Sequence, residues 1–171
     1  MTVTKTLEEP QFLSNDSQKY VNYSERHFTF SSMHYWLTDM ADLPQDQSAN
    51  PFYQRIPGQE VAVIPRFTLE CGTVMHNVPV AFKTWGKLST ERTNVLVICH
   101  ALSGSADVSD WWGPLLGPGR AFDTDKYMVI CMNSLGSPYG TASPVTAKNG
   151  NVAEGWYGPD FPPTSIRDDI K

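Results

Sequence analysis

The chain has 171 residues, of which 40% are hydrophobic and 12% aromatic, and its formal net charge is −5. This composition is typical of one globular domain and excludes an intrinsically disordered chain. The negative charge and the lack of a bilayer-length apolar run or signal-peptide core argue against nucleic-acid and membrane partners. We therefore expect a cytoplasmic protein.

Cysteine and histidine are too few and too scattered to predict a metal site. The three cysteines are odd in number, and no Cys-x-x-Cys spacing is present. Because two of them fall in predicted strands, we expect buried thiols in a reducing compartment, at Cys71, Cys99 and Cys131. The sequence predicts no bound metal and no cofactor.

The chain divides near residue 58. Residues 1–58 are polar and lack sustained periodicity, and 40–51 resembles a linker rich in turn-forming residues. We expect a poorly ordered extension, whose apolar residues could pack locally or dock on the main domain: Phe28, Phe30, Tyr35, Trp36 and Leu37. Residues 59–171 carry dense structural signals and form the predicted domain.

The first strands of this domain are predicted as an antiparallel pair. Residues 66–70 alternate polar and apolar side chains, 71–73 form a turn, and 78–85 continue as a second strand. Pro79, near the start of that strand, favours a place at the edge of a sheet.

Two apolar runs, at 94–99 and 127–133, predict strands that are buried on both faces, as in parallel sheets. A short helix over 109–116, capped by Ser109, is expected between them. These elements predict the α/β class.

A Gly/Pro/Ser-rich loop from 134 to 163 follows, and it is long enough to form a lid or the wall of a site. Ser165 with Asp168 then forms a capping-box pattern, which starts a helix that Lys171 leaves no room to continue. We therefore expect the chain to be part of a longer protein.

Small and polar residues from His100 to Ser105 follow the strand at 94–99, where parallel strands deliver ligand-binding loops. No G-x-S-x-G nucleophile elbow occurs, so we do not expect Ser103 or Ser105 to be a nucleophile. His100 precedes this loop, and we assign it a structural role.

A series of motifs covers the chain from about Pro65 to its end, at residues 82–86, 94–102, 110–114, 133–140 and 165–169. In their order and spacing these motifs resemble homoserine O-acetyltransferases, most closely the fungal form. The resemblance implies the amino-terminal part of an α/β-hydrolase fold, incomplete before the nucleophile elbow. It also implies transfer of acetyl from acetyl-CoA to the hydroxyl of L-homoserine, a step toward methionine.

The resemblance further implies a serine acyl-enzyme whose Ser, Asp and His lie beyond Lys171, with the elbow about 20 to 30 residues further on. Within this sequence it implies that the backbone N–H of Leu102 forms half of the oxyanion hole. Ser103, Gly104 and Asn133 are candidates for the substrate pocket, although Asn133 could simply stabilise a tight turn. Acetyl-CoA is expected as a co-substrate, and the full-length protein as a possible homodimer.

Other activities remain compatible with this sequence. The same scaffold could transfer succinyl, acylate serine or a fungal β-lactam precursor, or hydrolyse an ester, and a non-catalytic isoform is a further alternative. Because the strand at 94–99 should pair with the absent nucleophile strand, we expect the 171-residue chain alone to be inactive and marginally folded.

Overall fold

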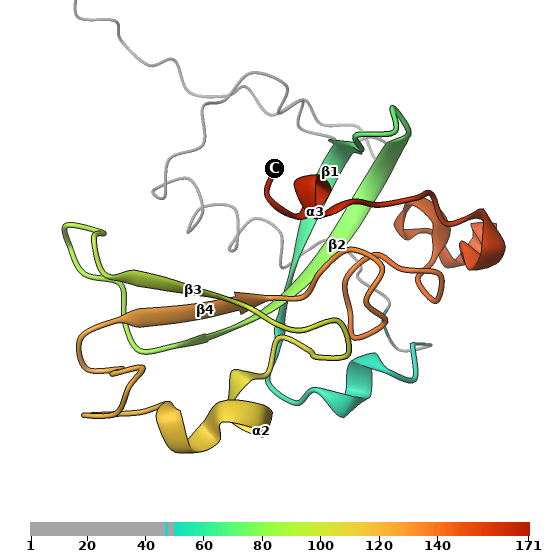
Figure 1. The fold of residues 1–171 in the computed structure, drawn as a ribbon. Helices are drawn as coiled ribbons and strands as arrows, with labels where there is room; N and C mark the ends of the chain where they lie inside the picture. The colour runs from blue at the N-terminus through green and yellow to red at the C-terminus, as the bar shows by residue number, and fades with distance from the viewer. Residues whose placement is uncertain (1–46, 48–49) are drawn as a thin grey trace, which may run out of the picture.

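The computed structural model describes residue 47 and residues 50–171. Within this part of the chain, four strands form one mixed sheet in the order β1-β2-β4-β3 (Figure 1). The strands are β1 (Glu60–Thr68), β2 (Val74–Trp85), β3 (Val95–Cys99) and β4 (Met128–Met132). The first two pairings are antiparallel and β3 pairs with β4 in parallel, which confirms the predicted α/β class and strand directions.

The long strand β2 connects the two halves of the sheet. Its residues from Val74 to Phe82 pair with β1, and its last residues, from Phe82 to Trp85, pair with β4. The prediction of two edge strands is therefore correct for β1 and wrong for β2. Both strands also begin earlier than the sequence indicated, because the run through Pro65 and the run before Pro79 remain extended and paired.

Short helical segments connect and flank the strands. Helix α2 (Val108–Trp112) and the 3-10 turn η2 (Gly113–Leu115) follow β3, and the helical turn α3 (Ile166–Asp169) begins after Ser165 as predicted. The cap of α2 is Asp107 rather than Ser109, because the Asp107 side chain accepts the Ser109 N–H. The remaining 3-10 turns are η1 (Tyr53–Arg55), η3 (Lys148–Gly150), η4 (Val152–Glu154) and η5 (Gly158–Asp160).

Among the described residues, two apolar clusters form the core. One lies between α2, η2 and strands β3 and β4, with buried residues Ile98, Val108, Leu116, Val129 and Cys131. The other lies at the β1–β2 hairpin, with Leu69, Met75, Val78 and Ala142. Figure 1 shows α2 beside the β3–β4 half of the sheet and α3 close to the β1–β2 hairpin.

Strand β3 is covered on one face only in the described structure. Ile98 packs into the core, whereas Val97 is 58% exposed and Cys99 is exposed. Successive side chains of a strand point to opposite faces, so covering by α2 can bury only one of the two sets. The prediction that both faces are buried is therefore wrong here, and the buried-thiol prediction is correct for Cys131 but wrong for Cys71 and Cys99.

The predicted extension over residues 1–58, including the apolar residues at 28–37, lies largely outside the described residues, since 1–46 and 48–49 are not described. Gln47 donates to the Gly140 carbonyl at 3.1 Å, and Asn50 donates to the Pro138 carbonyl at 2.9 Å.

In the part of the chain that is described, no helix is long and apolar enough to cross a membrane.

Candidate functional site

Residues 100–107, which we call the β3 loop, leave the carboxyl end of β3 and lead into α2. The Leu102 side chain, near the centre of the loop, is fully exposed, whereas Ser105 and Asp107 are buried. The Gly104 N–H donates to the Ala101 carbonyl at 2.7 Å and closes a turn around Leu102. The loop therefore has an exposed centre and a buried distal end.

Close packing favours glycine at position 104. A Cβ at this position would lie 3.0 Å from His100 Cβ and 3.1 Å from the Ala101 carbonyl oxygen. Both contacts are shorter than normal carbon packing distances. Gly104 therefore allows the loop to fold tightly over the His100 ring.

His100 joins the β3 loop to the segment that follows β4. Its Nδ1 lies 2.8 Å from the Ala101 carbonyl oxygen, and its Nε2 lies 3.2 Å from the Ser134 N–H donor. A neutral ring with its proton on Nδ1 satisfies both bonds, because Nδ1 then donates and Nε2 accepts. This geometry fits the structural role predicted for His100.

The distal end of the β3 loop is held by a buried ion pair. Lys83 Nζ lies 2.7 Å from Asp107 Oδ2, with the two side chains 13% and 12% exposed. The other oxygen of Asp107 accepts the N–H and the hydroxyl of Ser109, and the Asp107 N–H donates to Ser105 Oγ at 3.2 Å. Burial alone would raise the pKa of Asp107, but the Lys83 and Ser109 hydrogen bonds and the Lys83 charge lower it overall.

The Leu102 N–H, predicted as an oxyanion donor, lies at the exposed centre of this loop. Among the described residues it has no hydrogen-bond partner. Ser103 is exposed and Gly104 is half-buried. A fixed backbone donor without a partner is the kind of group that stabilises a developing oxyanion, because it needs no reorganisation during the reaction.

Asn133 lies at the carboxyl end of β4, next to the Ser134 that His100 contacts. It is 2% exposed, its N–H donates to Ala81, and its carbonyl accepts the Thr141 hydroxyl. The side-chain Oδ1 accepts from Ser137 at 3.1 Å, as a turn-stabilising asparagine would. Its Nδ2 has no partner among the described residues. The turn therefore accounts for the amide oxygen of Asn133 but not for its NH2 group.

The structure thus brings the predicted residues to one end of the sheet. Leu102, Ser103 and Gly104 lie on the β3 loop, and Asn133 lies at the end of the adjacent strand. Sequence reasoning missed the pairing of Lys83 with Asp107, because the two residues are 24 positions apart and no local pattern links them. Among the described residues, no group of three or more potential metal ligands gathers.

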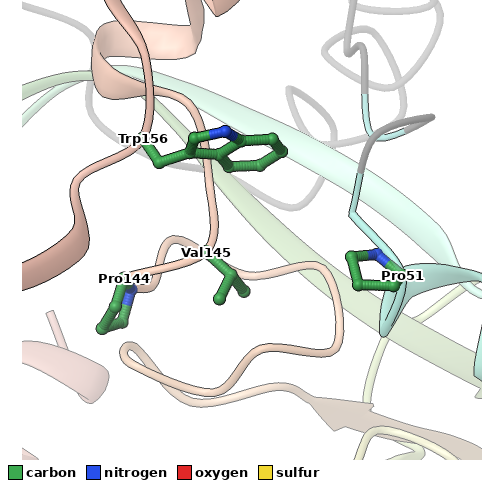
Figure 2. A pocket seen from close by; sticks show the side chains of 4 residues that line it. All are labelled: Pro51, Pro144, Val145 and Trp156. Atoms are coloured by element: carbon green, nitrogen blue, oxygen red, sulfur yellow. The ribbon is translucent and has the colours of Figure 1, made fainter.

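A separate apolar hollow is present away from these residues in sequence. It is lined by Pro51, Pro144, Val145 and Trp156 (Figure 2). None of these residues was predicted for the site, and none carries a charged or nucleophilic group. The hollow therefore has an apolar lining and contains no side chain that could act as acid, base or nucleophile.

Comparisons with known proteins agree with the motifs. No protein-family model matches the chain. A homoserine O-acetyltransferase of Gibberella fujikuroi is 73% identical over 122 residues, covering 71% of this chain and 29% of that protein. The homoserine O-acetyltransferase of Schizosaccharomyces pombe is 60% identical over 126 residues, covering 72% of this chain and 25% of that protein. The chain therefore spans between a quarter and a third of the length of these relatives.

Solved structures show the same relationship at the level of the fold. The homoserine O-acetyltransferase of Bacillus anthracis matches with a TM-score of 0.56 and 30% identity, covering 65% of this chain and 33% of the other. An acetylester hydrolase of Corynebacterium glutamicum matches with a TM-score of 0.57 and 29% identity, covering 71% and 33%. Over the matched segment, this chain is similar in sequence to homoserine O-acetyltransferases, and its sheet is part of an α/β-hydrolase fold.

Proposed function

We propose that the complete protein transfers the acetyl group of acetyl-CoA to the side-chain hydroxyl of L-homoserine. The product would be O-acetyl-L-homoserine, which fits a role in methionine biosynthesis. The observation that carries this proposal is the sequence identity of 73% to a homoserine O-acetyltransferase across the segment that contains the β3 loop.

The proposed reaction has two acyl-transfer steps. A serine, which we expect in residues following Lys171, attacks the thioester carbonyl, and a histidine takes its proton. The C–S bond then breaks, and the thiolate of CoA receives that proton. In the second step the homoserine hydroxyl gives its proton to the same histidine and attacks the acetyl-serine, which releases the product and restores the serine.

The contribution of this chain is stabilisation of the oxyanion in both steps. The carbonyl oxygen becomes negatively charged each time a nucleophile adds, and we assign the Leu102 N–H as one of its donors. Loss of one such donor costs about 10²–10³ in rate in enzymes of this kind. We place Ser103, Gly104 and Asn133 beside the same pocket, with acetyl-CoA as co-substrate and no metal or bound cofactor.

The test uses the complete gene product with acetyl-CoA, and it measures CoA release and identifies the products by mass spectrometry. We expect O-acetylhomoserine with homoserine as acceptor, and slower turnover with serine as acceptor or with succinyl-CoA as donor. The 171-residue chain serves as a second sample, and we expect it to release no CoA.

A hydrolase is the second candidate, because an acetylester hydrolase of known structure shares this fold at 29% identity. Acetate as the main product in the presence of homoserine would favour that candidate. Absence of any CoA release from the complete protein would favour a non-catalytic protein. We further propose a cytoplasmic homodimer, which sedimentation of the complete protein and imaging of a tagged copy would test.

A further inference from the structure

The β3 loop is fixed at both ends, and the two attachments come from different strands. At the proximal end, His100 accepts the Ser134 N–H that follows β4. At the distal end, Lys83 of β2 pairs with Asp107. Leu102 lies between these two attachments with its N–H unpaired among the described residues.

Lys83 is unusually well fixed for a lysine. Its ammonium donates to Asp107 Oδ2 at 2.7 Å and to the Pro57 carbonyl at 3.0 Å, and it lies 5.6 Å from the centre of the Trp85 ring. In the antiparallel pairing of β2 with β4, Lys83 lies opposite Cys131, in the middle of the sheet. A charge held in this way by a rigid strand gives Asp107 a defined position.

We propose that Lys83 is a positioning residue for the proposed acyl transfer, and that it acts through Asp107 to set the direction of the Leu102 N–H. This inference rests on the proposed function for its consequence in catalysis, but the loop geometry itself does not. Lys83 touches no reacting atom in this scheme, and its effect on the reaction comes through its contact with the β3 loop.

The physical reason is the cost of an unpaired buried charge. Without the ammonium, the Asp107 carboxylate would keep its Ser109 bonds but lose its only ion-pair partner among the described residues. An uncompensated carboxylate moves toward water when it can. That movement would carry Ser105 along with it, since the Asp107 N–H donates to the Ser105 hydroxyl. The turn at Ala101–Gly104 would then lose its fixed distal end.

Catalysis is sensitive to such displacements, because a donor that misses the oxyanion by about 1 Å can cost up to about 10²-fold in rate. We therefore expect Lys83→Met in the complete protein to lower kcat about tenfold, with KM for homoserine changed by less than about twofold. Lys83→Arg keeps the charge and should restore most of kcat. The control is Lys148→Met, which breaks a more exposed ion pair of 2.8 Å with Asp160 outside the β3 loop.

Amide hydrogen exchange gives a readout that does not depend on activity. In Lys83→Met, exchange of the peptide covering 100–107 should accelerate, while exchange of the β1–β2 peptides stays at the level of the wild type. If Lys83→Met does not fold, Lys83→Gln carries the same test, because it also leaves the Asp107 carboxylate without a positive partner among the described residues. The double variant Lys83→Met/Asp107→Asn leaves no unpaired buried charge, so exchange at 100–107 should return toward the wild-type level.

The outcomes separate this inference from the proposed function. Unchanged kcat together with unchanged exchange at 100–107 would overturn the inference, and so would a faster exchange that extends over the whole sheet. If the wild-type protein shows no acyl transfer, the proposed function fails, and exchange at 100–107 alone then decides whether Lys83 positions the loop.

Discussion

The Ser134 N–H donates to Nε2 of His100 across 3.2 Å, so one imidazole ring connects the segments that leave β3 and β4. The other ring nitrogen lies 2.8 Å from the Ala101 carbonyl oxygen, within the turn that presents Leu102. The relative position of the two predicted pocket segments therefore depends on a side chain that touches both.

Replacing His100 by alanine should loosen this connection. The change leaves the Ser134 N–H and the Ala101 carbonyl without their partner, and we expect a loss of about 1–2 kcal/mol in the free energy of unfolding. Urea denaturation of the complete protein measures the loss. His76→Ala, on the exposed side of β2, is the control and should change stability by less than about 0.5 kcal/mol. Equal losses in the two variants would contradict the connecting role.

Gly104→Ala should be destabilising for steric reasons. The added Cβ would meet His100 and the Ala101 carbonyl at 3.0 to 3.1 Å, and relief of that overlap should cost about 1–3 kcal/mol. Gly113→Ala is the matched control, because its Cβ would meet nothing within 4 Å and its φ of −46° suits alanine. Thermal unfolding of the two variants checks the difference. A Gly104→Ala protein as stable as Gly113→Ala would show that the turn is not tightly packed.

Asp168 should make stability depend on pH in the acid range. Burial alone would raise its pKa, but the N–H groups of Glu70 and Ser165, at 2.7 and 2.8 Å, lower it overall. A carboxyl whose pKa is lower in the folded state stabilises the fold above its unfolded pKa of about 4, and that contribution is lost as pH falls through the folded pKa.

The Tm difference between the wild type and Asp168→Asn should therefore shrink as pH is lowered from 7 to about 2. Glu91→Gln, in an exposed turn, is the control for removal of a carboxyl without such donors. A Tm difference that stays constant over this range would contradict the assigned role of the Asp168 carboxylate.

Cys71 and Cys131 should differ sharply in their reaction with iodoacetamide. Burial raises the pKa of Cys131 to about 11, whereas hydrogen bonding with Thr73 lowers the pKa of the exposed Cys71. At pH 8 only about one in a thousand Cys131 thiols would be ionised, and the thiolate is the reactive form. Mass spectrometry of the native complete protein should find Cys71 alkylated, and Cys131 alkylated only after unfolding. Rapid native labelling of Cys131 would contradict the packing of β4 against α2.

Local sequence patterns predicted the local structure well. The apolar runs gave β3 and β4 to within two residues, and the Ser165 pattern predicted α3, in which the Asp168 carboxylate accepts the Ser165 N–H. These features depend on neighbours within a few positions, where periodicity and capping chemistry act. The β3 loop was predicted for the same reason, as small residues directly after a strand.

Long-range relationships were not predictable in this way. Lys83 and Asp107 meet only because β2 passes beside β4 and the β3 loop, which no spacing along the chain encodes. The exposure of Cys99 was missed because an apolar run does not reveal how many faces of its strand are covered. The cap of α2 was misplaced by two residues because Asp107 and Ser109 are both good capping residues.

The most direct measurement concerns the Leu102 N–H itself. An α-hydroxy acid incorporated at position 102 of the complete protein replaces this N–H by an ester oxygen and keeps the leucine side chain. We predict that kcat for acetyl transfer from acetyl-CoA to homoserine falls about 10²–10³-fold, while the same replacement at Ser103 changes it less than tenfold. A rate within threefold of the wild type for the Leu102 ester would contradict the assignment of this backbone donor to the oxyanion.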